Sequence, residues 1–350
     1  MCLMLWACAA TAQDSLTYVN ANQFILTGKA KETTAIYQRI DKQETAPMPK
    51  AVQGLAMNSA GIAVLFESNS PLIAVRWKLA EDKYHANMTP VAHSGLDLYA
   101  WVNGNWQYVS VARPAKGLIV QDQVVVRRMD TTMKQFMLYL PLYNSVSELA
   151  IGIHKKALIR KPAKPHIDKS KRVVIYGSSI VQGASASRPG MAYPAIMQRK
   201  QGIDVINLGF SGNAKMEMEL ARYLATVDAD CYVLDCIPNQ TPDQVAERSL
   251  PFIRYLREKR PHTPIIIVES VIREHGYFDR QVGETVKRQN EYIRKTYEQL
   301  KAEKYKNIYY IPANQFMLSD HEGTLDGTHL TDVGFRSIAG AVLKALKKAM

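Results

Sequence analysis

Short apolar stretches separated by turn residues fill the chain between positions 51 and 153 and predict β-strands. Four of them, GIAVLFES, LIAVRWKL, VVVRRM and QFMLYLPL, are rich in β-branched and aromatic residues. The clearest signal is at residues 96–112, where two alternating runs flank Asn103-Gly104, a dipeptide that tolerates positive φ in a type I′ hairpin turn. Regularly spaced strands without helical patterning predict an all-β, jelly-roll-like sandwich.

The hydrophobic pattern changes at Arg172, where apolar strands begin to alternate with amphipathic helices. The five strands are RVVIYG, DVINLG, CYVLDC, PIIIVES and NIYYIPA. One helical stretch starts at Thr241-Pro242, an N-cap residue followed by proline at the first helical position. This alternation predicts a parallel sheet covered by helices on both faces. Sites in such sheets form at the carboxyl ends of the strands, so the chemistry is expected there.

The segment YGSSIVQG, residues 176–183, follows the first of these strands. Five residues separate its glycines and Ala184 comes next, so it is not a Walker phosphate loop, and it lacks the G-x-G-x-x-G pattern of dinucleotide sites. Val181 replaces the last glycine of G-x-S-x-G, which excludes an α/β-hydrolase elbow. The remaining interpretation is a serine at a turn from strand to helix. Its amide would be one of the N–H groups at the helix start that have no partner within the helix.

A serine nucleophile needs a base that is itself held by a third group. The segment LDGTHLTDVG, residues 325–334, is the one neighbourhood that offers both. Asp326 and His329 are three apart there, a spacing that can place the carboxylate beside one ring nitrogen and leave the other facing a serine. Taken alone, a histidine in such a segment is more often an ordinary surface or core residue, and the aspartate is more often a helix cap.

Two further strand ends offer hydrogen-bond donors. Gly209 ends the second strand, where a bare backbone amide can approach a ligand closely, and Asn239 follows the third. Taken alone, Gly209 is typical of a turn glycine, and Asn239 is typical of an Asx-turn after Pro238. Together with the Ser179 amide they would supply three donors to an oxyanion, as acyl transfer requires.

In combination, these blocks resemble the SGNH (GDSL-like) hydrolase superfamily over residues 172–350. The segment GLDLY, residues 95–99, resembles the motif of a β-sandwich domain that precedes SGNH domains in exported bacterial proteins. The resemblance implies an α/β fold with a flavodoxin-like, three-layer parallel sheet behind the sandwich. It also implies a carboxylic ester hydrolase that forms an acyl-enzyme and needs no metal or organic cofactor.

The same resemblance implies a role for each residue. Ser179 corresponds to the nucleophile, His329 to the general base and Asp326 to the residue that orients the base. The oxyanion hole is expected to consist of the amides of Ser179 and Gly209 and the side chain of Asn239.

The sequence departs from the family pattern at two places. Ser178 stands where the first block usually has aspartate, so a hydrogen bond in that turn is expected to differ. Ile237 replaces the glycine two positions before Asn239, with Pro238 between them, which predicts a bulkier and stiffer turn beside the acyl pocket.

A chain of 350 residues is long for one domain. We expect a signal-peptide remnant at 1–12, a β-sandwich accessory domain at 13–155, a basic linker at 156–171 and a hydrolase domain at 172–350. The apolar start ends in the small-residue pattern Ala10-Thr11-Ala12 but lacks a basic n-region. It predicts secretion or a periplasmic location, with a disordered tail or a lipoprotein as alternatives.

The formal net charge of +12 raises the question of nucleic acid, but no basic face with interleaved aromatics supports such a partner. No internal apolar run reaches the roughly 20 residues of a membrane span. Cys231 and Cys236 fall on opposite faces of one strand and are expected to be buried free thiols, and no cysteine–histidine spacing indicates a metal.

The expected substrate is a small-molecule or glycan ester, and the sequence leaves the oligomeric state open. We favour removal of O-acetyl groups from carbohydrates, because an accessory sandwich and no evident long lid fit glycan handling better than lipid. The alternatives are a lipolytic acyl esterase or lysophospholipase, and a non-catalytic glycan-binding protein. Trp101, Trp106 and Tyr108 could stack on sugars, although core packing is their more common use, and His93 is a candidate for the site's rim.

Overall fold

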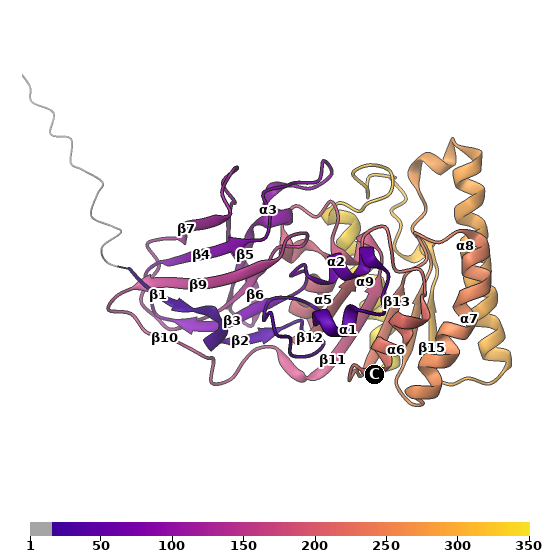
Figure 1. Cartoon of the computed structure of the whole chain (residues 1–350), viewed down its shortest axis with the longest axis horizontal. Coiled ribbons are helices and arrows are strands. Elements are labelled where there is room, and N and C mark those ends of the chain that lie inside the picture. The colour runs from indigo at the N-terminus through magenta and orange to yellow at the C-terminus, as the bar shows by residue number, and fades with distance from the viewer. Residues whose placement is uncertain (1–15) are drawn as a thin grey trace, which may run out of the picture.

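The computed structural model describes residues 16–350 and shows a β-sandwich beside an α/β domain (Figure 1). The first sheet of the sandwich has the order β1 (Leu16–Asn20), β9 (Val146–His154), β4 (Ile73–Leu79), β7 (Val120–Val126). The second runs β10 (Ile159–Arg160), β3 (Ala63–Ser68), β8 (Lys134–Tyr139), β5 (Leu96–Val102), β6 (Asn105–Ala112), with β2 (Ile25–Thr27) also paired to β3. Apolar side chains of both sheets, among them Phe66 and Trp77, form one core, which confirms the predicted sandwich.

The hairpin between β5 and β6 turns where the sequence predicts it. Asn103 has φ +48° and Gly104 has φ +79°, the two positive angles that a type I′ turn requires. The register pairs Tyr99 with Tyr108 and Trp101 with Trp106 across the two strands.

The α/β domain contains the five predicted parallel strands. Their order is β12 (Ile203–Gly209), β11 (Asp168–Gly177), β13 (Cys231–Asp235), β14 (Ile265–Val268), β15 (Ile308–Ile311). This 2-1-3-4-5 order is that of flavodoxin-like sheets, so the predicted fold class is confirmed. Cys231 and Cys236 are buried free thiols, as expected.

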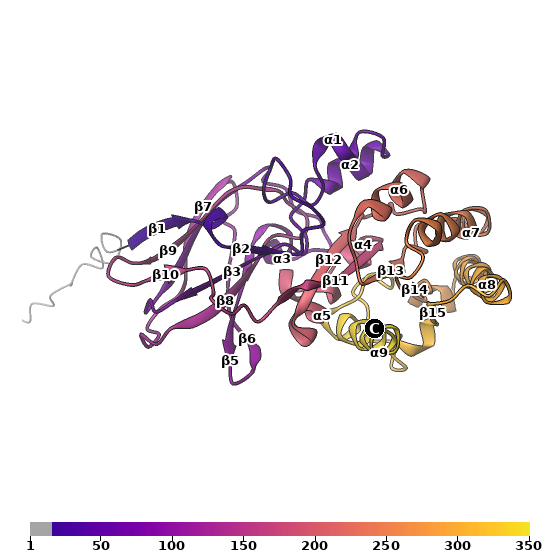
Figure 2. The same cartoon turned by 90° about the horizontal axis from the view of Figure 1, so that it is seen from below.

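Helices cover both faces of this sheet (Figure 2). One face carries α5 (Tyr193–Gln201) and α9 (Asp332–Ala349), and the other carries α6 (Met218–Thr226), α7 (Pro242–Lys259) and α8 (Arg280–Ala302). Alternate residues of β11 point to opposite faces of the sheet. Val173 and Ile175 lie in the core under α5 and α9, and Val174 and Tyr176 lie in the core under α6, α7 and α8. Shorter helices complete the chain: η2 (Ala21–Gln23), α3 (Pro90–Ser94), α4 (Ser179–Gln182), η3 (Pro189–Met191), η4 (Glu274–Tyr277) and η5 (Ala313–Gln315).

An arm at residues 28–60 leaves the sandwich and packs on the α/β domain (Figure 2). It carries α1 (Lys42–Thr45) and α2 (Lys50–Ala56). Ile40 and Val52 are buried in the same core as the residues of α6 and α7. The buried Arg39 donates hydrogen bonds to the carbonyl oxygens of Asn207, at 3.2 Å, and Gly209, at 2.6 Å. Sequence analysis did not detect this arm.

The stretch predicted as a linker, 156–171, is structured at both ends. β10 lies inside it and pairs with β3, and β11 already begins at Asp168. The connection between the domains therefore begins with a strand of the sandwich and ends in a strand of the α/β sheet. Among residues 16–350 we find no helix with the length and apolar character that crossing a membrane requires.

The GLDLY motif lies at the joint between the domains. Asp97 is fully buried, and its Oδ2 accepts hydrogen bonds from Arg188 Nη1 at 2.8 Å and the Gly190 amide at 2.8 Å. Tyr99 contacts Arg188 through its hydroxyl and through its ring. Burial raises the pKa of the Asp97 carboxyl, although the Arg188 charge opposes the rise. The motif thus fixes the segment that follows α4 to the sandwich.

We expect Arg188→Ala to lower the free energy of unfolding by about 3 kcal/mol, because it leaves the Asp97 carboxylate buried without its charged partner. Urea denaturation followed by circular dichroism measures the change. Arg222→Ala is the matched control: it removes an exposed ion pair with Glu219 and should cost about 0.5 kcal/mol or less. Equal effects of the two substitutions would show that the buried pair does not stabilise the joint.

Candidate active site

The turn after β11 presents Ser179 at the start of α4. A Cβ on Gly177 would lie 2.1 Å from the carbonyl oxygen of Asp235, so only glycine fits there. Ser178 is the N-cap of α4: its hydroxyl accepts from the Ile180 amide at 3.3 Å, and its own amide donates to the Asp235 carbonyl at 3.2 Å. The serine that replaces the usual aspartate therefore closes the turn by itself.

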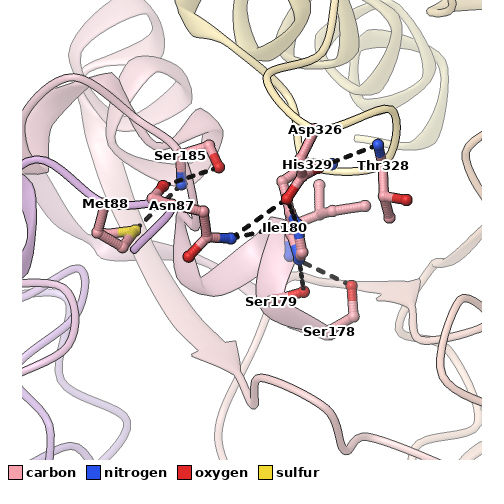
Figure 3. Close-up of polar contacts among 9 residues, drawn as sticks. All are labelled: Asn87, Met88, Ser178, Ser179, Ile180, Ser185, Asp326, Thr328 and His329. Atoms are coloured by element: carbon pink, nitrogen blue, oxygen red, sulfur yellow. Dashed lines mark hydrogen bonds and ion pairs between the residues drawn. The ribbon is translucent and has the colours of Figure 1, made fainter. Parts of the chain in front are cut away.

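The structure brings Ser179, His329 and Asp326 together, although Ser179 and His329 are 150 residues apart (Figure 3). Ser179 Oγ lies 2.9 Å from His329 Nε2, and His329 Nδ1 lies 2.7 Å from Asp326 Oδ2. The loop that carries the last two is closed by a hydrogen bond from the Leu325 amide to the His329 carbonyl at 2.8 Å. A serine hydroxyl, an imidazole and a carboxylate thus form one continuous hydrogen-bonded chain.

Asp326 is held in its ionised form. Partial burial alone would raise its pKa, but hydrogen bonds from the His329 amide and ring and from the Thr328 amide outweigh burial and lower the pKa below the ordinary value. An ionised Asp326 keeps the proton of the neutral ring on Nδ1 of His329, which leaves Nε2 free to accept the Ser179 proton.

Gly209 is not brought together with these residues. It is the last residue of β12, and its amide donates to Asn207 Oδ1 at 2.9 Å. A Cβ there would lie 2.1 Å from the amide nitrogen of Gln182, so this glycine is needed for close packing of β12 beneath α4. Its N–H is already used within the fold.

Gly212, which sequence analysis missed, lies three residues further on. It has φ +70° and open space around its Cα. Among the described residues its N–H has no hydrogen-bond acceptor, as is also true of the Ser179 amide. Asn239 reaches the same turn, where its Nδ2 donates one hydrogen to the Asn213 carbonyl at 2.9 Å. The segment NLGFSGN contains two glycines, Gly209 and Gly212. β12 ends at the first of them, so only the second lies in the loop beyond the strand.

Two family profiles match the chain. Residues 170–347 match the GDSL-like Lipase/Acylhydrolase family, and residues 16–159 match the GxDLY family, the N-terminus of Esterase_SGNH_hydro-type proteins. The chain belongs to the GDSL-like lipase/acylhydrolase family. It is thus a carboxylic ester hydrolase of the SGNH type.

Solved structures agree with this membership. A GDSL-like lipase from Bacteroides ovatus is 45% identical to this GDSL-like hydrolase, with a TM-score of 0.90 over 95% of this chain and 98% of that one. The salicylyl-acyltransferase SsfX3 from a tetracycline biosynthetic pathway is 19% identical, with a TM-score of 0.73 over 97% and 96%. The acetyl xylan esterase Est2A from Butyrivibrio proteoclasticus is 12% identical, with a TM-score of 0.57 over 95% and 98%. The similarities to SsfX3 and Est2A show the fold alone. No curated protein matches the chain.

The β-sandwich of this GDSL-like hydrolase contributes one residue that sequence analysis did not find. Asn87, in the loop between β4 and α3, places its Nδ2 3.4 Å from both Asp326 Oδ2 and His329 Nδ1 (Figure 3). Ser185 Oγ donates to the Asn87 carbonyl at 3.1 Å and holds this loop against the α/β domain. No local motif marks such a residue, because only the tertiary fold brings it near the loop of Asp326.

His93 does not lie at the rim. It is fully buried, its Nδ1 lies 2.8 Å from Ser94 Oγ, and burial lowers its pKa to about 4. It packs against the buried ring of Tyr143 and the exposed ring of His85. Across residues 16–350 of this GDSL-like hydrolase, no three histidine, cysteine or carboxylate side chains gather in a way that could hold a metal ion.

Proposed function

We propose that this hydrolase is an exported serine esterase that removes O-acetyl or other short acyl groups from carbohydrates. The observation that carries the catalytic part is the hydrogen-bonded chain from Ser179 Oγ through His329 to Asp326, with separations of 2.9 and 2.7 Å. Such a chain supplies what a weak serine nucleophile lacks: a base within reach and a carboxylate that orients the base.

The first half of the reaction transfers the acyl group to Ser179. As Oγ attacks the ester carbonyl carbon, its proton passes to His329 Nε2, and Asp326 stabilises the imidazolium that forms. His329 then gives this proton to the oxygen of the leaving alcohol as the carbon–oxygen bond breaks. A water molecule repeats the sequence on the acyl-enzyme, which releases the carboxylic acid and restores the serine.

The oxyanion is expected to lie between three donors. The Ser179 and Gly212 amides have no acceptor among the described residues, and Asn239 has a second Nδ2 hydrogen beyond the one given to Asn213. All three belong to loops at the carboxyl ends of β11, β12 and β13, which are neighbours in the sheet. Donors fixed before the reaction stabilise developing negative charge without reorganisation, and this is often a large part of catalysis.

We expect Asn239→Ala to lower kcat by about 10²- to 10³-fold with little change in KM, because the side-chain donor acts mainly on the charged intermediate. Steady-state hydrolysis of 4-nitrophenyl acetate measures both constants. Asn213→Ala is the control: it leaves intact the backbone carbonyl that Asn239 contacts and should change kcat by less than about tenfold. A rise in KM at constant kcat would instead indicate a substrate-binding role for Asn239.

The carbohydrate part of the proposal rests on two kinds of support. An accessory β-sandwich is joined to the catalytic domain and sends Asn87 to its catalytic loop. Est2A, an acetyl xylan esterase, shares the fold across both domains. Export rests on the GxDLY domain and on the leader-like start, which lies outside the described residues 16–350.

Acetate release from a panel of acetylated glycans tests the substrate class directly. A parallel series of 4-nitrophenyl acetate, butanoate and octanoate tests acyl length, and we expect activity to fall steeply after the short chains. Preference for octanoate would favour the lipolytic alternative. If the folded wild-type protein hydrolyses none of these esters, the alternative of a glycan-binding protein remains.

A further inference from the structure

A cavity lies between the β5–β6 hairpin of the sandwich and helix α5, where Figure 2 shows the hairpin projecting beside the α/β domain. Its volume is about 460 Å³, and residues of both domains line it. Ser179, Asp326 and His329 are not among the lining residues. The cavity is within the size range of small-molecule sites, roughly 300–1,000 Å³, and it is separate from the catalytic residues.

One wall of the cavity is aromatic. Cross-strand pairing places Tyr99 beside Tyr108 and Trp101 beside Trp106, and all four line the cavity. One face of Trp101 is covered by the ring of His166, stacked at 4.0 Å, which fixes the indole in place. Tyr108 is 43% exposed, which is unusual for so large a ring. Rigid, accessible aromatic rings bind the apolar faces of flat or cyclic ligands.

Basic side chains lie against this aromatic wall: the Arg188 guanidinium is 4.1 Å from the centre of the Tyr108 ring, and the Arg199 guanidinium is 4.1 Å from the centre of the Tyr99 ring. Arg188, Arg199 and Lys200 come from the segment that ends in α5, and Arg336 comes from α9. No acidic side chain is among the lining residues, and Asp97, behind the wall, pairs with Arg188 and also interacts with the charge of Arg199. Lys200 and Arg336 are exposed and form no ion pair with any described residue. Clustered cations of this kind attract anions, and a guanidinium group binds a carboxylate with two hydrogen bonds.

We propose that this cavity binds an acidic sugar, a uronate residue of a glycan. Its ring offers apolar C–H faces to the aromatic wall, and its carboxylate pairs with the arginines. A neutral sugar would leave the cations unpaired, and inorganic phosphate has no face for the rings. The site would hold a polymer to the enzyme by contacts that do not involve the ester-cleaving residues.

Packing at the domain joint accounts for only some of the residues that line the cavity. Tyr99 and Arg188 belong to the contacts around Asp97 and hold the domains together whether or not a ligand binds. Tyr108 also belongs to the joint, because the Arg188 guanidinium stacks on its ring at 4.1 Å. Lys200 and Arg336 have no share in that joint, and these two exposed cations are the part of the cavity that packing leaves unexplained.

Isothermal titration of the full chain with an unacetylated oligogalacturonide tests the proposal, with a xylo-oligosaccharide of equal length as the neutral comparison. The cavity variants are the double substitution Lys200→Glu with Arg336→Glu, and Trp106→Ala. The matched control is Lys301→Glu with Lys306→Glu, an identical change of net charge at exposed positions at the end of α8 and in the loop after it.

We expect the wild type to bind the oligogalacturonide more tightly than the neutral sugar, with affinity reduced at least about tenfold in each cavity variant and about twofold or less in the control. Hydrolysis of 4-nitrophenyl acetate should be unchanged in all of them, so this test is independent of the esterase proposal. No binding by the wild type, equal binding of the neutral sugar, or equal losses in the charge control would each overturn it. If Trp106→Ala does not fold, the double charge variant decides alone.

Discussion

Replacing Ser179 by alanine should lower kcat for 4-nitrophenyl acetate by about 10⁴- to 10⁶-fold, because no other hydroxyl occupies the position 2.9 Å from His329 Nε2. The residual rate would come from the oxyanion donors and from substrate binding alone. Stopped assays at high enzyme concentration are needed to measure it, with mass spectrometry to show that no acyl-enzyme accumulates.

Ser178→Ala is the internal control for this substitution. It removes the adjacent hydroxyl, which caps α4, and should cost about 1 kcal/mol of stability but less than about tenfold in kcat. The double substitution of Ser179 and His329 by alanine should be hardly worse than Ser179→Ala, since the two act as one unit. Additive losses, or an active Ser179→Ala enzyme, would exclude Ser179 as the nucleophile.

Replacing Asp326 by asparagine should lower kcat by about 10⁴-fold at neutral pH. The amide removes the charge that stabilises the imidazolium, and its NH₂ group would drive the ring into the tautomer whose Nε2 cannot accept the Ser179 proton. Circular dichroism should show an unchanged fold, because Asp326 is partly exposed and the loop keeps its backbone hydrogen bond.

The pH dependence gives this prediction a second readout. The pKa of Asp326 is lowered in the folded protein, so its stabilising contacts are fully present above the ordinary aspartate value and are lost only as the pH falls through the lowered pKa. The activity ratio of wild type to Asp326→Asn should therefore shrink as the pH falls through that lowered pKa, where the wild type loses the same charge. Asp320→Asn, at an exposed position of the preceding loop, should change kcat by about twofold or less. A similar loss in this control would contradict a specific role for Asp326.

The regular part of the fold could be predicted because its signals are local. The strands of the α/β domain are continuous apolar runs that only burial on both faces explains, and helical patterns separate them. The β5–β6 hairpin follows from Asn103-Gly104, since the turn type is encoded in two residues. The arm at 28–60 has two short helices and no long periodic run, so only its tertiary contacts define it.

The residues of the candidate site also divide into those with a local sequence signal and those that only the tertiary fold brings together. Ser179, Asp326 and His329 could be selected from sequence, because a strand-to-helix turn and a three-residue spacing carry their arrangement. The choice between Gly209 and Gly212 depended on where β12 ends, and strand ends are the least certain part of such a prediction. Asn87 approaches Asp326 from 239 positions away, in a different domain, and nothing local to its sequence indicates this contact.

The arm also determines the order in which the protein can complete its folding. Arg39 hydrogen-bonds to the carbonyl of Gly209, 170 positions later, so during synthesis this contact of the arm cannot form until β12 has emerged. Such a distant contact closes a long loop, which makes completion of the amino-terminal half slow and dependent on the carboxyl-terminal half. Cleavage at 160–167 would therefore leave two fragments that must stay associated, and neither fragment alone should give a sharp cooperative thermal transition.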